Sequence, residues 1–404
     1  MDINVEKIEN DLNSTFKDID NIVMFNSKKV LDAFHKENIQ ASDFNGTSGY
    51  GYGDVGRDKI ERVYADVFKA EKALVRVQFV SGTHALTVGL FGLLRPGNTL
   101  LSISGIPYDT LHKVIGIVPN ESSLKSFNIN YKYIDLIDND FDYKKIKNSL
   151  DNVKVVHIQR SIGYSDRETI SIDKLSKVIK FIKEINKDII IFVDNCYCEF
   201  CSKIEPIELG ADIVVGSLIK NLGAGIANNG AYIIGKEKLV ELCAERLTSP
   251  GLGSEVGSSL NQNRLFLEGL FLAPLVVGNA LKVKMFSSAL AKELGYKVIN
   301  DNLNDIVLGI VFNNENKLIN YVKGIQKNSA IDSGFAPIPS KMPGYDNDII
   351  MASGSFTDGS SIELSCDAPI KPSYIAYQQG SLTYEYGKIG VIEAFKELEE
   401  NKNE

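Results

Sequence analysis

The stretch Val214-Val-Gly-Ser-Leu-Ile-Lys-Asn221 places a serine and a lysine directly after a short apolar run. A second apolar run, Ile191-Phe-Val-Asp-Asn195, ends at an acid. Similar runs recur along the chain, mostly with helix-length segments between them: Val75–Val80, Thr99–Ile103, Ile129–Ile134, Val153–Ile158, Ile189–Val193, Asp212–Val215 and Ala231–Ile234. Continuous Val/Ile/Leu runs are typical of strands buried on both faces. The sequence therefore predicts an α/β fold with a mainly parallel sheet flanked by helices.

The segments around this sheet predict three regions. Residues 5–35 have apolar residues at near-helical spacing, which indicates an N-terminal helical arm. Later come a glycine-rich loop at 45–54 and a helix at 57–68, and the segment 257–295 could form one long helix. Beyond it we expect strands at 305–312, 349–353 and 360–365 and helices at 317–326 and 384–400. We predict an arm (1–48), a large domain (49–285) and a smaller C-terminal α+β domain (286–404).

Length and charge narrow the classes of function. The chain has 404 residues and a net charge of −8, which argues against a nucleic-acid partner. The N-terminus lacks the pattern of a signal peptide, so we expect a cytoplasmic protein with reduced thiols at its five cysteines. The apolar segment from Leu265 to Leu281 is interrupted by Glu268 and Pro274. It is too short for a membrane span, and we expect a buried helix and no membrane partner.

Three motifs at predicted strand ends carry candidate chemistry, because ligands of open α/β sheets bind at the carboxyl ends of strands. The turn Ser81-Gly-Thr-His84 opens a helix and could cradle a phosphate, although it could equally be an ordinary N-cap. Asp194 could pair with a protonated pyridine nitrogen or form a structural salt bridge. Lys220 could lose solvation, lower its pKa and form a Schiff base, or simply extend to solvent.

The order of these motifs favours the functional interpretation. A phosphate cradle, then an acid, then a lysine 26 residues after that acid is the order required by a pyridoxal phosphate (PLP) enzyme of the aspartate aminotransferase fold type, fold type I. In this interpretation Lys220 holds the cofactor's aldehyde covalently, and Asp194 holds the pyridinium nitrogen. The phosphate is held by Ser217 with Ser81, Gly82 and Thr83.

The chain also resembles a known family. Val193-Asp-Asn195 is similar to the Val-Asp-Asn motif of the Cys/Met metabolism enzymes, the cystathionine lyases and methionine gamma-lyases. Longer blocks resemble the bacterial family called aluminium resistance protein or methionine gamma-lyase-like. These blocks are Gly49-Tyr-Gly-Tyr-Gly-Asp-Val-Gly-Arg-Asp58, Val80-Ser-Gly-Thr-His-Ala85, Pro107-Tyr-Asp-Thr110, Ile158-Gln-Arg-Ser161, Gly216-Ser-Leu-Ile-Lys-Asn221 and Gln379-Gly-Ser-Leu-Thr-Tyr-Glu-Tyr-Gly387, which together span nearly the whole chain.

The resemblance implies roles for further residues. Tyr108 matches the aromatic residue that stacks on the cofactor ring; a half-buried core tyrosine is the alternative. Tyr52 and Arg57 resemble the pair that related lyases extend to the neighbouring subunit's cofactor phosphate, although a surface salt bridge would also account for Arg57. Gln159 and Arg160 could face the cofactor's O3′ or a substrate carboxylate. A homodimer or homotetramer with shared active sites follows from these roles.

Two departures from the family pattern concern the substrate. The loop after the lysine reads Lys220-Asn-Leu-Gly-Ala-Gly225 where the family commonly has Lys-Asn-Pro-Gly-Gly-Gly. The cystathionine lyases bind the substrate carboxylate with an arginine of the C-terminal domain, but no arginine follows Arg264 here. Lys371 is the nearest cation in that domain and cannot offer the same fork of donors. Recognition of the carboxylate could otherwise fall to Arg160, Arg167 or Arg264.

The function implied is that of a PLP-dependent carbon–sulfur lyase acting on a sulfur-containing amino acid, of the cystathionine beta-lyase or methionine gamma-lyase type. Lys220 would take the Cα proton, and Tyr108, with a lowered pKa, would protonate the leaving sulfur. An aminotransferase or another PLP enzyme of amino acids would use the same residues. A non-catalytic aluminium tolerance protein is the alternative of another class. Cys196, Cys198 and Cys201 lack the spacing of a zinc site, and we expect no metal there. His84 is expected to cap or pack.

Overall fold

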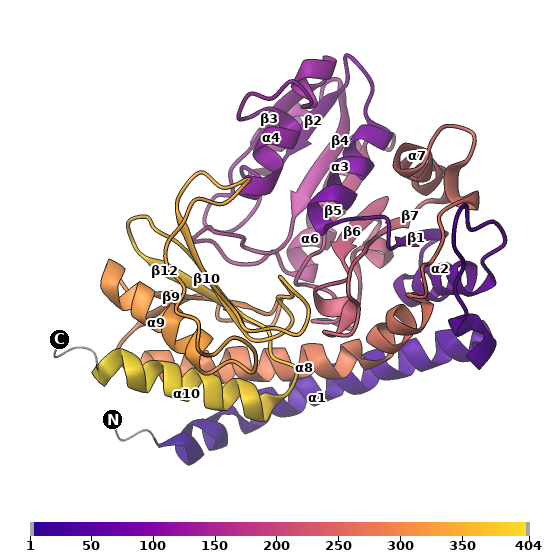
Figure 1. Cartoon of the computed structure of the whole chain (residues 1–404). Helices are drawn as coiled ribbons and strands as arrows, with labels where there is room; N and C mark the ends of the chain where they lie inside the picture. Colours follow the sequence, from indigo (N-terminus) through magenta and orange to yellow (C-terminus); the bar gives the residue numbers. More distant parts are fainter. Residues whose placement is uncertain (1–3, 401–404) are drawn as a thin grey trace.

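The computed structural model describes residues 4–400 and contains two sheets of different size (Figure 1). The α-helices in the described part are α1 (Val5–Lys36), α2 (Val55–Phe68), α3 (Gly82–Leu93), α4 (His112–Ile115), α5 (Tyr143–Ser149), α6 (Ile172–Ile185), α7 (Glu237–Leu247), α8 (Asn263–Glu293), α9 (Glu315–Lys327) and α10 (Tyr384–Glu400). The strands are β1 (Lys72–Arg76), β2 (Thr99–Ser102), β3 (Asn130–Tyr133), β4 (Val153–Gln159), β5 (Ile190–Asp194), β6 (Ile213–Ser217), β7 (Ala231–Gly235), β8 (Lys297–Ile299), β9 (Val307–Val311), β10 (Ile349–Ser353), β11 (Ser365–Pro369) and β12 (Ile375–Gln379).

The larger sheet has the strand order β1-β7-β6-β5-β4-β2-β3. The five strands from β6 to β3 pair in parallel, whereas β7 pairs antiparallel with both β6 and β1. The predicted mainly parallel sheet is therefore confirmed. The first predicted strand is displaced, because β1 ends at Arg76 and residues 77–80 form a turn that leads to α3.

Both faces of this sheet are buried, as the continuous apolar runs indicated. Along β5, Ile191 and Val193 belong to a core shared with α2, α6 and α8, while Ile190 and Phe192 belong to a second core with α3 and α7. Alternate side chains of a strand point to opposite faces, so a strand covered on both faces is apolar at every position. Figure 1 shows α3 and α6 on either side of the central strands.

Helix α8 connects the two sheets and runs alongside α1 (Figure 1). Its residues Val277 and Leu281 pack in the core of the large sheet, and Phe286 and Leu290 pack in the core of the small sheet. Its length and composition would suit a membrane span, but 67% of its most apolar window is buried in the described chain. The prediction of a buried helix is confirmed. The helix begins later than predicted because Gly257, Leu260 and Asn261 all have positive φ angles.

The smaller sheet is antiparallel, with the order β10-β11-β12-β9-β8. The predicted strand at 360–365 is wrong, since β11 begins only at Ser365. The Glu363 carboxylate accepts hydrogen bonds from the backbone N–H groups of Phe356 and Thr357, which folds this segment into a turn. Sequence patterns did not predict β8 and β12. The proposed boundary at residue 285 falls inside α8 and stays a prediction.

Candidate active site

The carboxyl ends of three neighbouring parallel strands form the floor of the candidate site. β4 ends at Gln159, β5 at Asp194 and β6 at Ser217, and the register places Gln159 opposite Asp194. Lys220 follows β6 by three residues. This edge of a parallel sheet is where α/β proteins bind ligands.

A cavity of about 340 Å³ opens at this edge. Eight of the residues that the sequence singled out line it together: Ser81, Gly82, Thr83, Tyr108, Gln159, Asp194, Ser217 and Lys220. Its other walls come from the C-terminal part of the chain, including Tyr345 and Met351. The volume is typical of a site for a small ligand or cofactor.

Lys220 points its ammonium group at an aromatic ring inside this cavity. Its Nζ lies 3.9 Å from the centroid of the Tyr197 ring, a cation–π contact. Burial on its own lowers the pKa of Lys220, but the neighbouring Cys196, Tyr197 and Asp194 outweigh it and raise the pKa above its ordinary value. The expectation of a lowered pKa is therefore wrong for the chain alone, because the acid at the end of β5 stabilises the ammonium form.

The surroundings of Ser217 fit a phosphate group. Its side chain is 1% exposed, and its hydroxyl has no hydrogen-bond partner among the described residues. A Cβ atom on Gly82 would lie 3.1 Å from the Ser217 Cβ, so a glycine at the start of α3 allows the helix to approach Ser217 closely. The first backbone N–H groups of a helix also lack partners within the helix and carry the positive end of its dipole. An anion held here would satisfy both sets of donors.

Asp194 is held in place by its own loop and by a buried layer below it. Its Oδ1 accepts a hydrogen bond from the Cys196 backbone N–H at 3.1 Å. The Arg160 guanidinium donates to Asn195 Oδ1 at 2.7 Å, and Asn195 donates to Glu205 at 3.1 Å. These contacts fix the segment that places the Asp194 carboxylate in the lining of the cavity.

Tyr108 is anchored through Gln159. The Gln159 Oε1 accepts a hydrogen bond from the Tyr108 backbone N–H at 2.7 Å, and its Nε2 donates to the Ser161 carbonyl at 3.0 Å. Burial, together with Tyr345, Tyr197 and Asp367, raises the pKa of Tyr108 well above its ordinary value. The expected lowered pKa is wrong, because these neighbours include acidic groups and no arginine. The phenol therefore keeps its proton at neutral pH.

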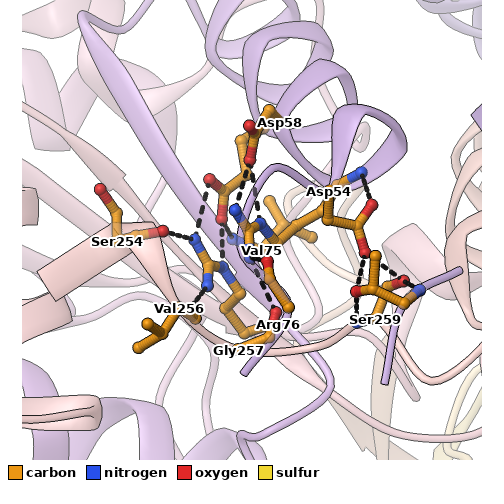
Figure 2. Close-up of polar contacts among 12 residues, drawn as sticks. Asp54, Asp58, Val75, Arg76, Ser254, Val256, Gly257 and Ser259 are labelled. Carbon is orange, nitrogen blue, oxygen red and sulfur yellow. Dashed lines mark hydrogen bonds and ion pairs between the residues drawn. The ribbon is translucent and has the colours of Figure 1, made fainter. Parts of the chain in front are cut away.

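Tyr52 and Arg57 lie outside the cavity of their own chain. Tyr52 is 60% exposed, whereas Arg57 is buried and donates through Nη1 to the carbonyls of Gly51 and Gly257 at 2.8 and 2.9 Å. Asp58 accepts a further bond from Arg57. Figure 2 shows this region, with the Asp54 carboxylate beside Ser259 and the Arg76 guanidinium beside Ser254 and Val256. The role of both residues at a neighbouring subunit's site stays a prediction.

The arginines that the sequence offered as carboxylate ligands do not line the cavity. Arg160 is 1% exposed and bonded to Asn195, and Arg264 is on the surface with Glu268. Arg167 donates to the backbone carbonyls of Gln159, Arg160, Ser161 and Glu168. Lys371 donates to the carbonyl of Tyr164 at 3.2 Å. Among the described residues that line the cavity, Lys220 is the only cation.

Several residues of the cavity were not found from the sequence. Tyr197 follows Asp194 by three residues and lies between Cys196 and Cys198, whose small side chains indicate only packing. The others come from the C-terminal wall: Tyr345, Ser360, Ser361, Ser365, Asp367 and Gln379. The hydroxyls of Ser360, Ser361 and Ser365 are buried without a hydrogen-bond partner among the described residues. The polar residues Ser365 and Asp367 alternate with Cys366, a pattern typical of a strand with one polar face. The strand predicted at 360–365 ends before this pattern, so it did not reveal these residues.

The cysteines and His84 have structural surroundings. All five cysteines are free and buried, and no cluster of three or more His, Cys, Asp or Glu residues suited to a metal occurs in residues 4–400. His84 accepts a hydrogen bond at Nδ1 from the Val80 N–H at 3.2 Å and packs against Phe79. Ser81 caps α3 by accepting from the His84 N–H at 3.0 Å.

Comparisons with known proteins agree on one family. A family model described as methionine gamma-lyase matches residues 1–399. The uncharacterised protein YnbB of Bacillus subtilis is 43% identical over 399 residues, covering 97% of this chain and 95% of YnbB.

Solved structures agree with this match. The candidate cystathionine beta-lyase involved in aluminium resistance of Listeria monocytogenes is 45% identical with a TM-score of 0.95, over 98% of this chain and 99% of its own. The carbon–sulfur lyase involved in aluminium resistance of Clostridium novyi is 48% identical with a TM-score of 0.92, over 97% and 94%. The PLP-dependent protein YhfS of Escherichia coli, at 18% identity and a TM-score of 0.64, over 94% and 97%, shares the fold.

Proposed function

This chain belongs to the methionine gamma-lyase family, and we propose that it is a PLP-dependent carbon–sulfur lyase that acts on a sulfur-containing amino acid. The observation that carries the proposal is the single cavity lined by Lys220, Asp194 and the unpartnered hydroxyl of Ser217. The names of the similar structures from Listeria and Clostridium support it.

Different residues of the cavity would hold different parts of the cofactor. Ser217 and the first residues of α3 would hold the phosphate, and Asp194 would hold the ring nitrogen in its protonated form. Lys220 Nζ would hold the aldehyde carbon covalently. When bound, PLP supplies an aldehyde that takes the substrate's amino group and a cationic ring that accepts electrons from Cα.

Two side chains would move protons during the elimination. Lys220 Nζ would act as the general base that removes the proton at the substrate's Cα. Tyr108 keeps its proton at neutral pH and would give it to the departing sulfur, so that a thiol leaves as the carbon–sulfur bond breaks. The Tyr345 hydroxyl lies 3.0 Å from the Tyr108 hydroxyl and could pass a proton to it.

A shared site is part of this proposal. The loop that carries Tyr52 leaves Tyr50 and Tyr52 71% and 60% exposed, and Val80 beside α3 is 72% exposed. Exposed aromatic and aliphatic residues beside a functional loop are typical of an interface. We propose that a homodimer or homotetramer buries them and brings Tyr52 to the neighbouring subunit's site, while Arg57 holds the loop that carries Tyr52.

A substrate panel tests the lyase activity. PLP-loaded protein is incubated with cystathionine, methionine and S-substituted cysteines, and the released thiol and keto acid are measured. The proposal expects both products in equal amounts from at least one substrate and neither from Lys220→Ala. Keto acid without thiol, together with amination of an added keto acid, would instead identify an aminotransferase.

A further inference from the structure

The C-terminal wall of the cavity is one face of the small antiparallel sheet. The register places Met351 opposite Asp367, and Ser353 opposite Ser365, which is opposite Gln379. Because side chains alternate along a strand, these five residues face the cavity, whereas Ala352, Cys366 and Gln378 face the other way and are buried. This face offers hydroxyls, one amide, one thioether and one acid.

Among the described residues that line the cavity, acidic side chains outnumber basic ones. Among the described residues that line it, Asp194, Asp367 and Lys220 are the only charged side chains. Asp367 is the only charged side chain that the C-terminal part of the described chain contributes to the lining. A carboxylate there disfavours a substrate anion and favours a cation.

Asp367 has few partners of its own. Its Oδ2 accepts one hydrogen bond, from Gln379 Nε2 at 3.2 Å. Burial raises its pKa to about 6, while Gln379, the charge of Lys220 and Tyr164 oppose the rise. Lys220 is the one cation that shares the cavity, and under the proposed function its Nζ is committed to the cofactor. Asp367 then has one hydrogen bond and no other cation among the described residues that line the cavity.

Four tyrosines of the site lie near this carboxylate. The negative charge of Asp367 adds to burial in raising the pKa of Tyr108, Tyr164, Tyr197 and Tyr345, so it lies within electrostatic reach of all four phenols. The Tyr108 and Tyr345 rings are 5.8 Å apart at an interplanar angle of 85°. The Lys220 ammonium above Tyr197 already shows that a cation can rest on an aromatic face in this cavity. An ammonium group that enters the cavity would be attracted by this carboxylate and could rest on one of these rings.

We propose that Asp367 is a specificity-determining residue that binds a positively charged group on the substrate's side chain, so that the preferred substrates are thioether amino acids with a cationic side chain. This inference rests on the proposed lyase function and names its substrate class. The other residues of this wall are uncharged and can contact either a cation or an anion. The preference for a cationic side chain therefore follows from Asp367.

Three S-substituted L-cysteines of similar size test the preference during turnover. S-(2-aminoethyl)-L-cysteine is cationic, S-propyl-L-cysteine is its neutral isostere and S-carboxymethyl-L-cysteine is anionic. We expect kcat/KM for thiol release to be about tenfold higher for the cationic than for the neutral substrate, and lowest for the anionic one. In Asp367→Asn the cationic-to-neutral ratio should fall to about one. In the matched control Asp346→Asn, whose carboxylate is at the surface beside His112, the ratio should stay as in the wild type.

A binding series separates the subsite from the reaction. L-Lysine, L-norleucine and L-2-aminoadipate have no sulfur to eliminate, and their affinity for the PLP-loaded protein is measured by calorimetry. The proposal expects lysine to bind about tenfold more tightly than norleucine, and this advantage to disappear in Asp367→Asn. Equal binding of the three, or tightest binding of aminoadipate, would overturn it. If no cysteine derivative releases thiol while lysine is still preferred, the lyase activity is wrong and the cation subsite stands.

Discussion

At Ser217 a buried hydroxyl stands at the end of a strand with no protein partner in the described chain. Native proteins rarely leave such a group unsatisfied, and an unbound ligand is a common reason. The same holds at the opposite wall for Ser360 and Ser365. These three hydroxyls line the cavity, where a bound ligand could satisfy them.

Replacement of Ser217 by alanine tests the phosphate cradle. The variant should fold normally, because the hydroxyl bonds nothing in the protein, yet bind PLP about 5- to 30-fold more weakly through loss of one charge-assisted hydrogen bond. Fluorescence titration with PLP measures the affinity. Ser102→Ala, at the end of β2 and outside the cavity, should leave it unchanged. Equal PLP affinity in Ser217→Ala and the wild type would place the phosphate elsewhere.

Glu199 should make stability depend on pH. Burial raises its pKa to about 8, although the Tyr232 hydroxyl, which donates to Oε1 at 2.7 Å, opposes the rise. Between pH 4.5 and 8 the folded chain therefore retains a proton that the unfolded chain releases, and the free energy of unfolding falls as the pH rises. Urea denaturation at pH 5, 6.5 and 8 should show a smaller fall in Glu199→Gln than in the wild type. Parallel profiles for the two proteins would contradict this assignment.

Sequence context predicts the positions of some residues of the cavity better than those of others. Asp194, Ser217 and Lys220 follow strongly apolar strands, so their place at the sheet edge could be inferred from the chain alone. Asp367 could not, because its strand is short and its side-chain direction depends on a register set by β10 and β12. The pKa directions of Lys220 and Tyr108 were also wrong, since they depend on acids brought together by the fold.

At the scale of elements, the glycine-rich loop before α2 is held by buried polar groups. Asp54 caps α2 by accepting from the Arg57 N–H at 2.9 Å, and it also accepts from Thr47 and Ser259. Burial works against the ionised form, yet these hydrogen bonds lower the pKa of Asp54 to about 2. The loop is therefore fixed in place although its tip, with Tyr50 and Tyr52, is exposed.

Substitution of Arg57 by lysine should loosen this loop. A lysine cannot reach the carbonyls of Gly51 and Gly257 with the geometry of a guanidinium, and we expect the free energy of unfolding to fall by about 1–3 kcal/mol. Chemical denaturation measures it. Arg62→Lys, whose side chain is 53% exposed and paired with Glu37, should change stability by less than about 0.5 kcal/mol. If the two variants are equally stable, the hydrogen bonds of Arg57 are not what holds the loop.

The elements that sequence patterns predicted best are long or strongly apolar. The helices α1 and α8 and the central strands β4 to β6 lie where the spacing of apolar residues placed them. The short strands β8 and β12 and the start of β11 are not predicted correctly. β8 has only three residues, β12 ends in Gln378 and Gln379, and β11 begins with Ser365, so none of them has a long apolar run.

At the scale of the whole molecule, one buried ion pair joins the two halves of the chain. Lys284 Nζ on α8 lies 3.0 Å from Asp305 Oδ1. The Oδ2 atom of Asp305 also accepts a hydrogen bond from the Ser161 hydroxyl at 2.7 Å. Ser161 follows β4 and Asp305 precedes β9, so this cluster connects the large sheet to the small one. The cavity between the sheets depends on their relative position.

Removal of the Asp305 carboxylate should destabilise the protein strongly. Asp305→Ala leaves the Lys284 ammonium buried and unpaired, with an expected loss of about 3–5 kcal/mol in the free energy of unfolding. Asp301→Ala removes the partner of Lys292, whose side chain is half exposed, and should cost less than about 1 kcal/mol. A loss below about 1 kcal/mol for Asp305→Ala would show that the cluster does not hold the sheets together.

The apolar runs and the order of the motifs predicted the fold class and the residues that form the cavity floor. They did not predict its C-terminal wall, because no local pattern fixes how a second sheet docks on the first. The charged side chains that line the cavity, among the described residues, are two carboxylates and one lysine.

The most direct test of the central claim is to locate the cofactor on the chain. PLP-loaded protein is reduced with borohydride and digested, and the peptides are mapped by mass spectrometry. The account predicts a phosphopyridoxyl group on Lys220, and an absorption band at roughly 420 nm before reduction that is absent from Lys220→Ala. A modification found on another lysine, or none in the PLP-loaded wild type, would contradict it.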